Sequence, residues 1–356
     1  MKVLKRSRNT IMKKRIQYID VAKGNAILCI ILGHMGMNEI NRVVFTFHVP
    51  IFFIITGYFT SKKLPVKEFV LTKARTLLVP YFLTCIVMSG LAIAINLLQG
   101  GVETKRTILE WMIATLYGAG DTWTDPFYVK GIGAIWFLWA SFWASVFLRI
   151  ALEMKAQLRV AFVLLLFVAG CWSAQELFWF PFSIQAGAAA TLYMYAGYLL
   201  RDLKEHMENV PREVKIFGTI GALFVWLQFI KNFQGFWFVH CHIGRGIIDV
   251  VGSFCGCYVV LLIAQFIETK IPMLTKGLCF YGKYSLLVLC VHIIELNLFP
   301  WWRIEWLLLD YGVTEFGAKM FVIFGKLVMI TIAVICCSKC RVITDLFGIT
   351  KRNNMR

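Results

Sequence analysis

Long apolar segments recur along this chain, and they limit its possible folds more than any other feature. Crossing a hydrocarbon layer of about 30 Å takes about 20 helical residues. Runs of about that length lie near 21–38, 43–60, 77–99, 133–151, 160–178, 183–200, 216–232, 246–267, 278–299 and 316–338. An open sheet or a bare loop would leave backbone groups unpaired in lipid. The sequence therefore predicts an all-α membrane protein built as a bundle of about ten transmembrane helices.

The composition excludes an ordinary soluble domain. Hydrophobic residues make up 59% of the chain and charged residues 16%, whereas soluble domains contain roughly 45–50% apolar and 25% charged residues. Aromatic residues reach 15%, which fits lipid contact and belts of Trp and Tyr at the membrane surfaces. Membrane lipids are therefore the expected surroundings of most of the chain.

The distribution of basic residues predicts the orientation in the membrane. Of 37 Lys and Arg residues, 26 fall in segments on one side of the ten-helix arrangement and 7 on the other. Because cytoplasmic segments carry the excess of positive charge, both termini are expected in the cytoplasm. This bias also explains the net charge of +17 without a nucleic-acid partner. We expect a basic cytoplasmic tail over 1–17, a transmembrane domain over 18–340 and a second basic tail over 341–356.

Two ionisable residues occupy the first apolar segment, where such groups are costly and mark functional sites. Lys23 and His34 are eleven residues apart, which places them on one stripe of a helix with about 16.5 Å between them. Asp20 lies one turn from Lys23 on the cytoplasmic side. Lysine there could neutralise an anionic compound entering from inside, while an imidazole farther out could accept a proton near neutral pH. The alternative is that Lys23 reaches the inner headgroups and His34 is a packing residue.

The second apolar segment contains another histidine followed by a proline. Proline removes a backbone donor and bends a helix, so Pro50 predicts a local widening beside His48 that a ligand or water could occupy.

Further polar groups lie in the later segments. His292 and Glu295, one turn apart, could order a site across the bundle or form a purely structural pair. Lys326 lies in the middle of the last apolar segment and requires a buried acidic or carbonyl partner. Arg245 and Asp249 have the spacing of a structural ion pair. We expect no metal at His240 and His242, because protein metal sites need three or four ligands.

Several motifs in fixed order resemble the acyltransferase 3 family, particularly its fucose 4-O-acetylase-like branch. They are Tyr18-Ile19-Asp20-Val21-Ala22-Lys23-Gly24 with Gly33-His34, then Phe47-His48-Val49-Pro50, Thr56-Gly57-Tyr58, Lys73-Ala74-Arg75-Thr76-Leu77-Leu78-Val79-Pro80-Tyr81, Ile135-Trp136-Phe137-Leu138, and Tyr281-Gly282-Lys283-Tyr284-Ser285-Leu286 with His292. They extend over most of the chain. Lys23 stands where the family usually has Arg, which keeps the charge and loses bidentate geometry toward phosphate. Thr56 stands where Ser is common, and Thr76 where another cation is frequent.

The resemblance implies transfer of an acyl group, usually acetyl from acetyl-CoA, to a hydroxyl of a cell-surface or lipid-linked glycan. It implies that His34 is the general base and that His48 orients the acceptor or polarises the thioester. Donor binding falls to Lys23, Asp20, Lys73 and Arg75. Substrate binding or ordering of the site falls to Tyr58, Trp136, Ser285, His292 and Glu295. The implied location is the bacterial cytoplasmic membrane, with the chain crossing it several times.

Two other function classes remain open at the level of sequence. A transporter or flippase could use Lys23, His34, His48 and Glu295 as a relay, but its usual inverted repeats with broken helices are not visible. A receptor or scaffold would explain neither the buried histidines nor the Lys23–His34 stripe. The acceptor sugar, the acyl chain and the oligomeric state depend on pocket and surface shape and have no local motif.

Overall fold

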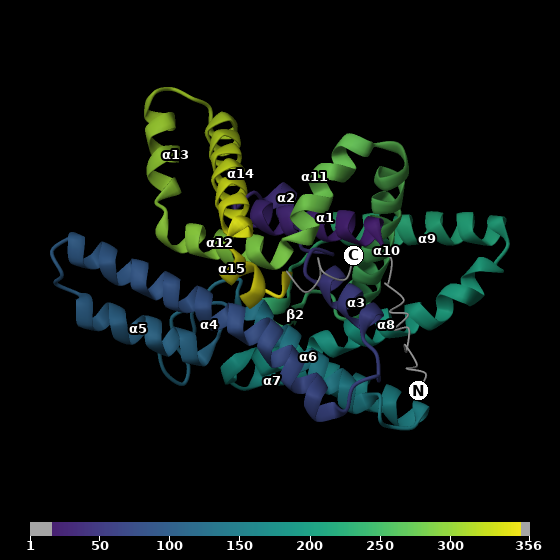
Figure 1. The fold of residues 1–356 in the computed structure, drawn as a ribbon. Helices are drawn as coiled ribbons and strands as arrows, with labels where there is room; N and C mark the ends of the chain where they lie inside the picture. The colour runs from purple at the N-terminus through teal and green to yellow at the C-terminus, as the bar shows by residue number, and fades with distance from the viewer. Residues whose placement is uncertain (1–15, 350–356) are drawn as a thin grey trace, which may run out of the picture.

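The computed structural model describes residues 16–349, apart from the side chains of 204–208. Helices dominate this part of the chain (Figure 1). They are α1 (Gln17–Gly33), α2 (Asn38–Val44), α3 (Pro50–Phe59), α4 (Val66–Leu98), α5 (Thr104–Tyr117), α6 (Trp136–Ala151), α7 (Ala156–Glu176), α8 (Ile184–Glu208), α9 (Arg212–Lys231), α10 (Ile247–Lys270), α11 (Pro272–Lys283), α12 (Ser285–Leu298), α13 (Trp301–Asp310), α14 (Glu315–Lys339) and α15 (Arg341–Leu346), with short 3-10 turns at Pro181–Ser183 and Phe238–His240. A two-stranded antiparallel ribbon joins β1 (Phe236–Trp237) to β2 (His242–Ile243).

Five helices are long and apolar enough to cross a membrane on their own: α4, α7, α9, α10 and α14. The pair α11 and α12 would supply a sixth span, although it is bent by 74°. The apolar helices α3 and α6 are shorter. The helical membrane class predicted from the sequence is confirmed, whereas the count of ten spans and the cytoplasmic position of the termini stay predictions.

Two predicted segments are not continuous helices. The segment 43–60 contains the end of α2, a run of turns and then α3, and Pro50 is the first residue of α3. The expectation that Pro50 bends a helix from within is therefore wrong. Its missing amide hydrogen falls where a helix leaves its first amides unpaired. The segment 278–299 is interrupted between Lys283 and Ser285.

Helix α1 packs against α11, α10, α12 and α3, and it lies near the middle of the fold in Figure 1. Its closest approach to α11 is made by two glycines. A Cβ at Gly24 would lie 2.0 Å from the carbonyl oxygen of Leu278, and a Cβ at Gly282 would lie 1.8 Å from that of Asp20. Small residues allow helices in membranes to come this close. The motif glycines thus fix α1 against α11.

Helices α3 and α8 are also brought close together by glycines. A Cβ at Gly57 would lie 1.8 Å from the carbonyl oxygen of Met194, and one at Gly197 would lie 1.9 Å from that of Ile54. Helix α8 also packs on α6 and α7. The glycine of the Thr56-Gly57-Tyr58 motif therefore has a packing role.

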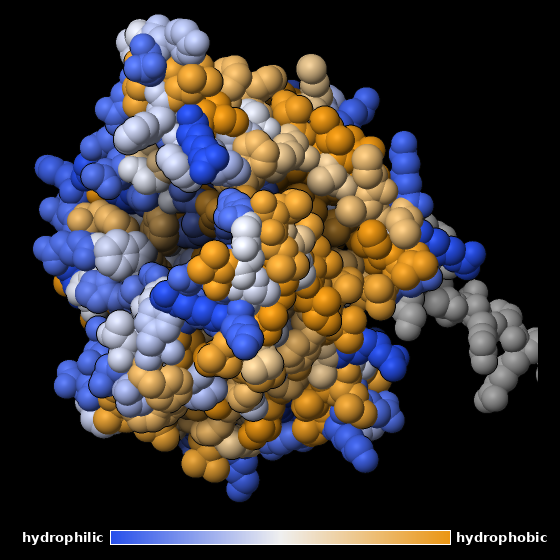
Figure 2. Space-filling view, turned by 90° about the vertical axis from the view of Figure 1, so that its left-hand side faces the viewer, coloured by the Kyte–Doolittle hydropathy of each residue, from blue (hydrophilic) through white to orange (hydrophobic). Residues whose placement is uncertain are grey.

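Large hydrophobic side chains cover much of the surface. Figure 2 shows them over the centre and right of one face, with hydrophilic residues gathered along its left edge. Phe217 on α9 and Phe324 on α14 are exposed by 74% and 67%. Apolar surface of this extent is unusual for a soluble monomer and suits contact with lipid tails.

Candidate active site

His34 lies at the C-terminal end of α1. It caps the helix with φ −87° and ψ 7°, and Gly36, at φ 66°, turns the chain toward α2. The Nδ1 atom of His34 lies 2.8 Å from the carbonyl oxygen of Ile30. The residue itself is exposed. One nitrogen is thus engaged by the helix, while part of the side chain stays accessible.

His292 on α12 contacts the same imidazole. Its Nε2 atom lies 3.4 Å from Nδ1 of His34, and the two rings meet edge to face with centroids 5.2 Å apart. Helix α12 packs against α1, α4 and α14. The bend at Ser285 gives α12 a direction different from that of α11, and that direction places His292 beside the end of α1.

Two charged residues extend this contact into the protein. Glu295 Oε2 lies 3.0 Å from Nδ1 of His292, and Glu295 Oε1 lies 3.1 Å from Nζ of Lys326 on α14. The side chains are almost inaccessible, with exposures of 0% for His292, 2% for Glu295 and 4% for Lys326. Lys326 has the buried acidic partner that its position in an apolar segment required. We call His34, His292, Glu295 and Lys326 the buried relay.

The order of contacts in the buried relay assigns the protons. Ionised Glu295 accepts a hydrogen bond, so His292 donates from Nδ1 and its Nε2 carries a lone pair. That lone pair accepts from Nδ1–H of His34, which also donates to the carbonyl of Ile30. A neutral His34 then has its lone pair on Nε2. The arrangement presents a proton acceptor at the accessible end of the relay.

His48 lies apart from this hydrogen-bonded series. It occupies the turn before α3, is buried, and has Nδ1 2.6 Å from the carbonyl oxygen of Val44. The ring of Phe45 meets it edge-on at 4.8 Å. His48 is nevertheless near enough to His34 for an electrostatic interaction. The two predicted catalytic histidines therefore belong to one region but not to one hydrogen-bond series.

The residues predicted to bind the donor lie on two helices. Lys23 forms an ion pair with Asp20 on α1, with 3.6 Å between Nζ and Oδ1. Lys73 and Arg75 lie on α4, where Lys73 covers the ring of Phe69 at 5.5 Å and Arg75 is exposed. The pairing of Lys23 with Asp20 leaves a local charge near zero on α1.

Three other predicted residues take separate positions. Tyr58 is half-buried near the end of α3, and Trp136 is buried at the start of α6. Ser285 begins α12 at the 74° bend. Of these three, Ser285 is on the helix that supplies His292 and Glu295.

The polar groups around the β1–β2 ribbon and the start of α10 form structural contacts. Arg245 and Asp249 form the expected ion pair, at 2.7 Å between Nη2 and Oδ1. His240 pairs with Asp121 at 3.1 Å. Among residues 16–349, no group of three or more His, Cys, Asp and Glu side chains is arranged to hold a metal ion.

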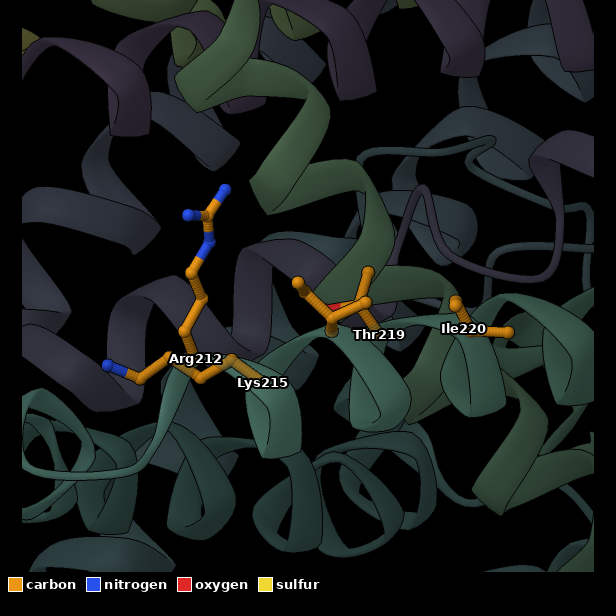
Figure 3. Close-up of a pocket in the computed structure, with 5 residues that line it drawn as sticks. Arg212, Lys215, Thr219 and Ile220 are labelled. Atoms are coloured by element: carbon orange, nitrogen blue, oxygen red, sulfur yellow. The ribbon is translucent and has the colours of Figure 1, made fainter.

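Two open hollows lie on other helices. One, of about 250 Å³, is on α9 and is lined by Arg212, Lys215, Ile216, Thr219 and Ile220 (Figure 3). The other, of about 560 Å³, is on α13 and is lined by Trp302, Arg303, Trp306, Leu307, Leu309 and Asp310. Neither includes a site residue predicted from the sequence.

Sequence reasoning found every member of the buried relay but missed two of its connections. The link from His292 to His34 crosses 258 residues of sequence and has no local signal. The partner of Lys326 did have a signal, because Glu295 is among the few acidic residues within the apolar segments.

Comparison with known protein families identifies the functional class of this protein. The family model described as an acyltransferase domain matches residues 16–338. The chain belongs to the acyltransferase 3 family. No curated protein and no solved structure matches it. The match extends from the first described residue almost to the end of α14 and therefore includes the whole buried relay. Family membership and the apolar helices together make the chain a multi-pass membrane acyltransferase, and they do not favour the transporter reading.

Proposed function

We propose that this acyltransferase moves an acetyl group from acetyl-CoA to a hydroxyl of a cell-surface or lipid-linked glycan, with His34 as general base. The observation that carries the proposal is the buried relay, which ends in the exposed imidazole of His34. Nothing else among the described residues combines a reachable base with such a buried support.

The proposed reaction balances without a further reactant. His34 Nε2 takes the proton of the acceptor hydroxyl while the hydroxyl oxygen attacks the carbonyl carbon of the thioester. The tetrahedral intermediate collapses and the carbon–sulfur bond breaks. His34 then returns its proton to the departing thiolate. The products are one acetyl ester and one free CoA thiol, and the base is restored.

Glu295 and His292 support the base through charge. When His34 accepts a proton, its imidazolium can still donate from Nδ1 to His292. The carboxylate of Glu295 holds His292 in the orientation that accepts this bond. A fixed acceptor and a nearby negative charge stabilise the imidazolium, as a carboxylate does in hydrolytic triads.

The remaining predicted residues fit supporting roles. Lys23, with Lys73 and Arg75, would attract the phosphates of CoA by charge. Asp20 pairs with Lys23 at 3.6 Å and would hold its ammonium until phosphate arrives. Tyr58, Trp136 and Ser285 would line or order the path of the substrates, and His48 would polarise the thioester carbonyl. We place the reaction in the bacterial cytoplasmic membrane.

The test uses the purified full-length protein in phospholipid vesicles with acetyl-labelled acetyl-CoA and a glycan extract. Release of CoA thiol together with label in ester linkage to glycan would support the proposal. Label bound to nothing but lipid, or no glycan-dependent thiol release from active protein, would contradict the acceptor class. Glycan movement across the vesicle without acyl transfer would favour a flippase instead.

A further inference from the structure

Lys326 is the one member of the buried relay to which the proposed chemistry assigns no role. Its ammonium lies 3.1 Å from Glu295 Oε1, on the side of the carboxylate away from His292. The ring of Trp301 covers it at 5.6 Å from the ring centroid, and the same ring rests against the backbone of Gly325. The lysine is therefore enclosed between an acid and an aromatic face.

We infer that Lys326 is a positioning residue for acyl transfer: it keeps Glu295 ionised and turned toward His292, and thereby keeps the lone pair of His34 on Nε2. This inference rests on the proposed function of His34. Lys326 acts through Glu295 and touches neither substrate.

The charge balance explains why Glu295 needs this partner. An isolated carboxylate buried away from water is strongly disfavoured and takes up a proton instead. A protonated Glu295 could donate to Nδ1 of His292, which would move the hydrogen of His292 to Nε2. The hydrogen on Nε2 of His292 would then face the hydrogen on Nδ1 of His34. This clash would disturb the tautomer that His34 needs to act as a base. The ammonium of Lys326 prevents this sequence by pairing with Oε1.

Among the titratable groups around Glu295, Lys326 is the cation that can keep its carboxylate ionised. Titratable groups that act on Glu295 are His292 from its own helix and Lys326 from α14. His34, from α1, contacts the histidine end of the relay, and the charge of Lys326 also acts on it directly. His292 is neutral when His34 is a free base, so it supplies no charge.

The decisive variant is Lys326→Met, which keeps an unbranched side chain of similar length and removes the charge. In the purified enzyme we expect kcat to fall about 10- to 100-fold, the range seen when groups that orient a reacting side chain are removed. The apparent KM for acetyl-CoA should stay within about twofold, because Lys326 touches no substrate. The matched control is Lys319→Met on the same helix, since Lys319 pairs with the exposed Glu315 outside the relay.

The double variant Lys326→Met with Glu295→Gln distinguishes positioning from a structural role. If Lys326 acts through the charge of Glu295, removing the lysine from a Glu295→Gln enzyme should cause no further loss of kcat. If the two single losses of kcat multiply in the double variant, the inference is overturned. A loss of kcat in Lys319→Met as large as that in Lys326→Met would also overturn it. So would a Lys326→Met loss that disappears when activity is expressed per folded protein, measured by size exclusion in detergent.

The same panel separates this inference from the proposed function. Full activity of Lys326→Met with inactive His34→Gln and Glu295→Gln enzymes would refute the role of Lys326 alone. Full activity of His34→Gln would refute the proposed base, and with it this inference.

Discussion

The Nε2 atom of His292 lies 3.4 Å from Nδ1 of His34, although 258 residues separate the two histidines along the chain. This contact joins the end of α1 to the middle of α12. Through this contact, the two histidines form the accessible end of the buried relay, which continues to the charged side chains of Glu295 and Lys326. Most of the testable consequences follow from that series.

Replacing His34 by Gln should lower acetyl transfer by about 100-fold or more, because general bases contribute about 10²–10⁴-fold. Glutamine keeps hydrogen-bonding capacity but cannot take up a proton near neutral pH. The measurement is acetylated glycan per unit of membrane-inserted protein. His242→Gln makes the same chemical change in β2 and should leave activity near the wild-type level. Near-normal acetylation by His34→Gln would move attention to His48 or His292.

Replacing Glu295 by Gln should lower kcat by about 100-fold, because a neutral amide no longer stabilises the imidazolium of His34 and can favour the wrong tautomer of His292. The apparent KM for acetyl-CoA should change little. Steady-state kinetics on purified protein would check both. Glu315→Gln, an exposed acid on α14, is the control. Equal kinetic constants for these two variants would exclude a role for the buried carboxylate.

The contact between α1 and α11 predicts a stability effect at Gly282. An alanine Cβ there would lie 1.8 Å from the carbonyl oxygen of Asp20, so the helices must separate, at a cost of about 1–3 kcal/mol. Gly282→Ala should therefore lower the thermal stability of the protein in detergent. Gly277→Ala, on the same helix and with open space around it, should be neutral or slightly stabilising. An unchanged melting temperature in Gly282→Ala would contradict this close packing.

Lys23 should contribute to donor binding through its charge. Lys23→Arg is expected to retain more activity than Lys23→Ala, with the loss in the alanine variant appearing mainly as a raised apparent KM for acetyl-CoA. Lys155→Ala, in a predicted cytoplasmic loop, controls for a general loss of surface charge. If wild type, Lys23→Arg and Lys23→Ala have the same kinetic constants, Lys23 has no part in the reaction.

The ten-helix topology predicts that reporter fusions after Glu305 and after Arg356 lie in opposite compartments, with the second in the cytoplasm. The reason is the bias of Lys and Arg toward one set of segments. Paired cytoplasmic and periplasmic reporters on the intact chain would measure both positions. The same compartment for both fusions would refute the topology.

The family motifs contain the proposed site residues, but they give no account of the glycines among them. Gly24, Gly57 and Gly282 each lie where a Cβ would meet the backbone of another helix within about 2 Å. Close helix crossing is a property of two segments together, so one segment alone cannot display it.

The sequence by itself determined the helical membrane class, the family and the residues of the buried relay. Those features are local: an apolar run, a charge inside it and a short motif are all visible within one segment. Tertiary structure decided that α12 is bent from α11 by 74°, that Pro50 begins a helix, and that Glu295 joins His292 to Lys326. These depend on which helices pack side by side. An apolar run predicts that a segment lies in lipid. It does not predict which other helix the segment packs against, because lipid tails and helix surfaces are equally apolar.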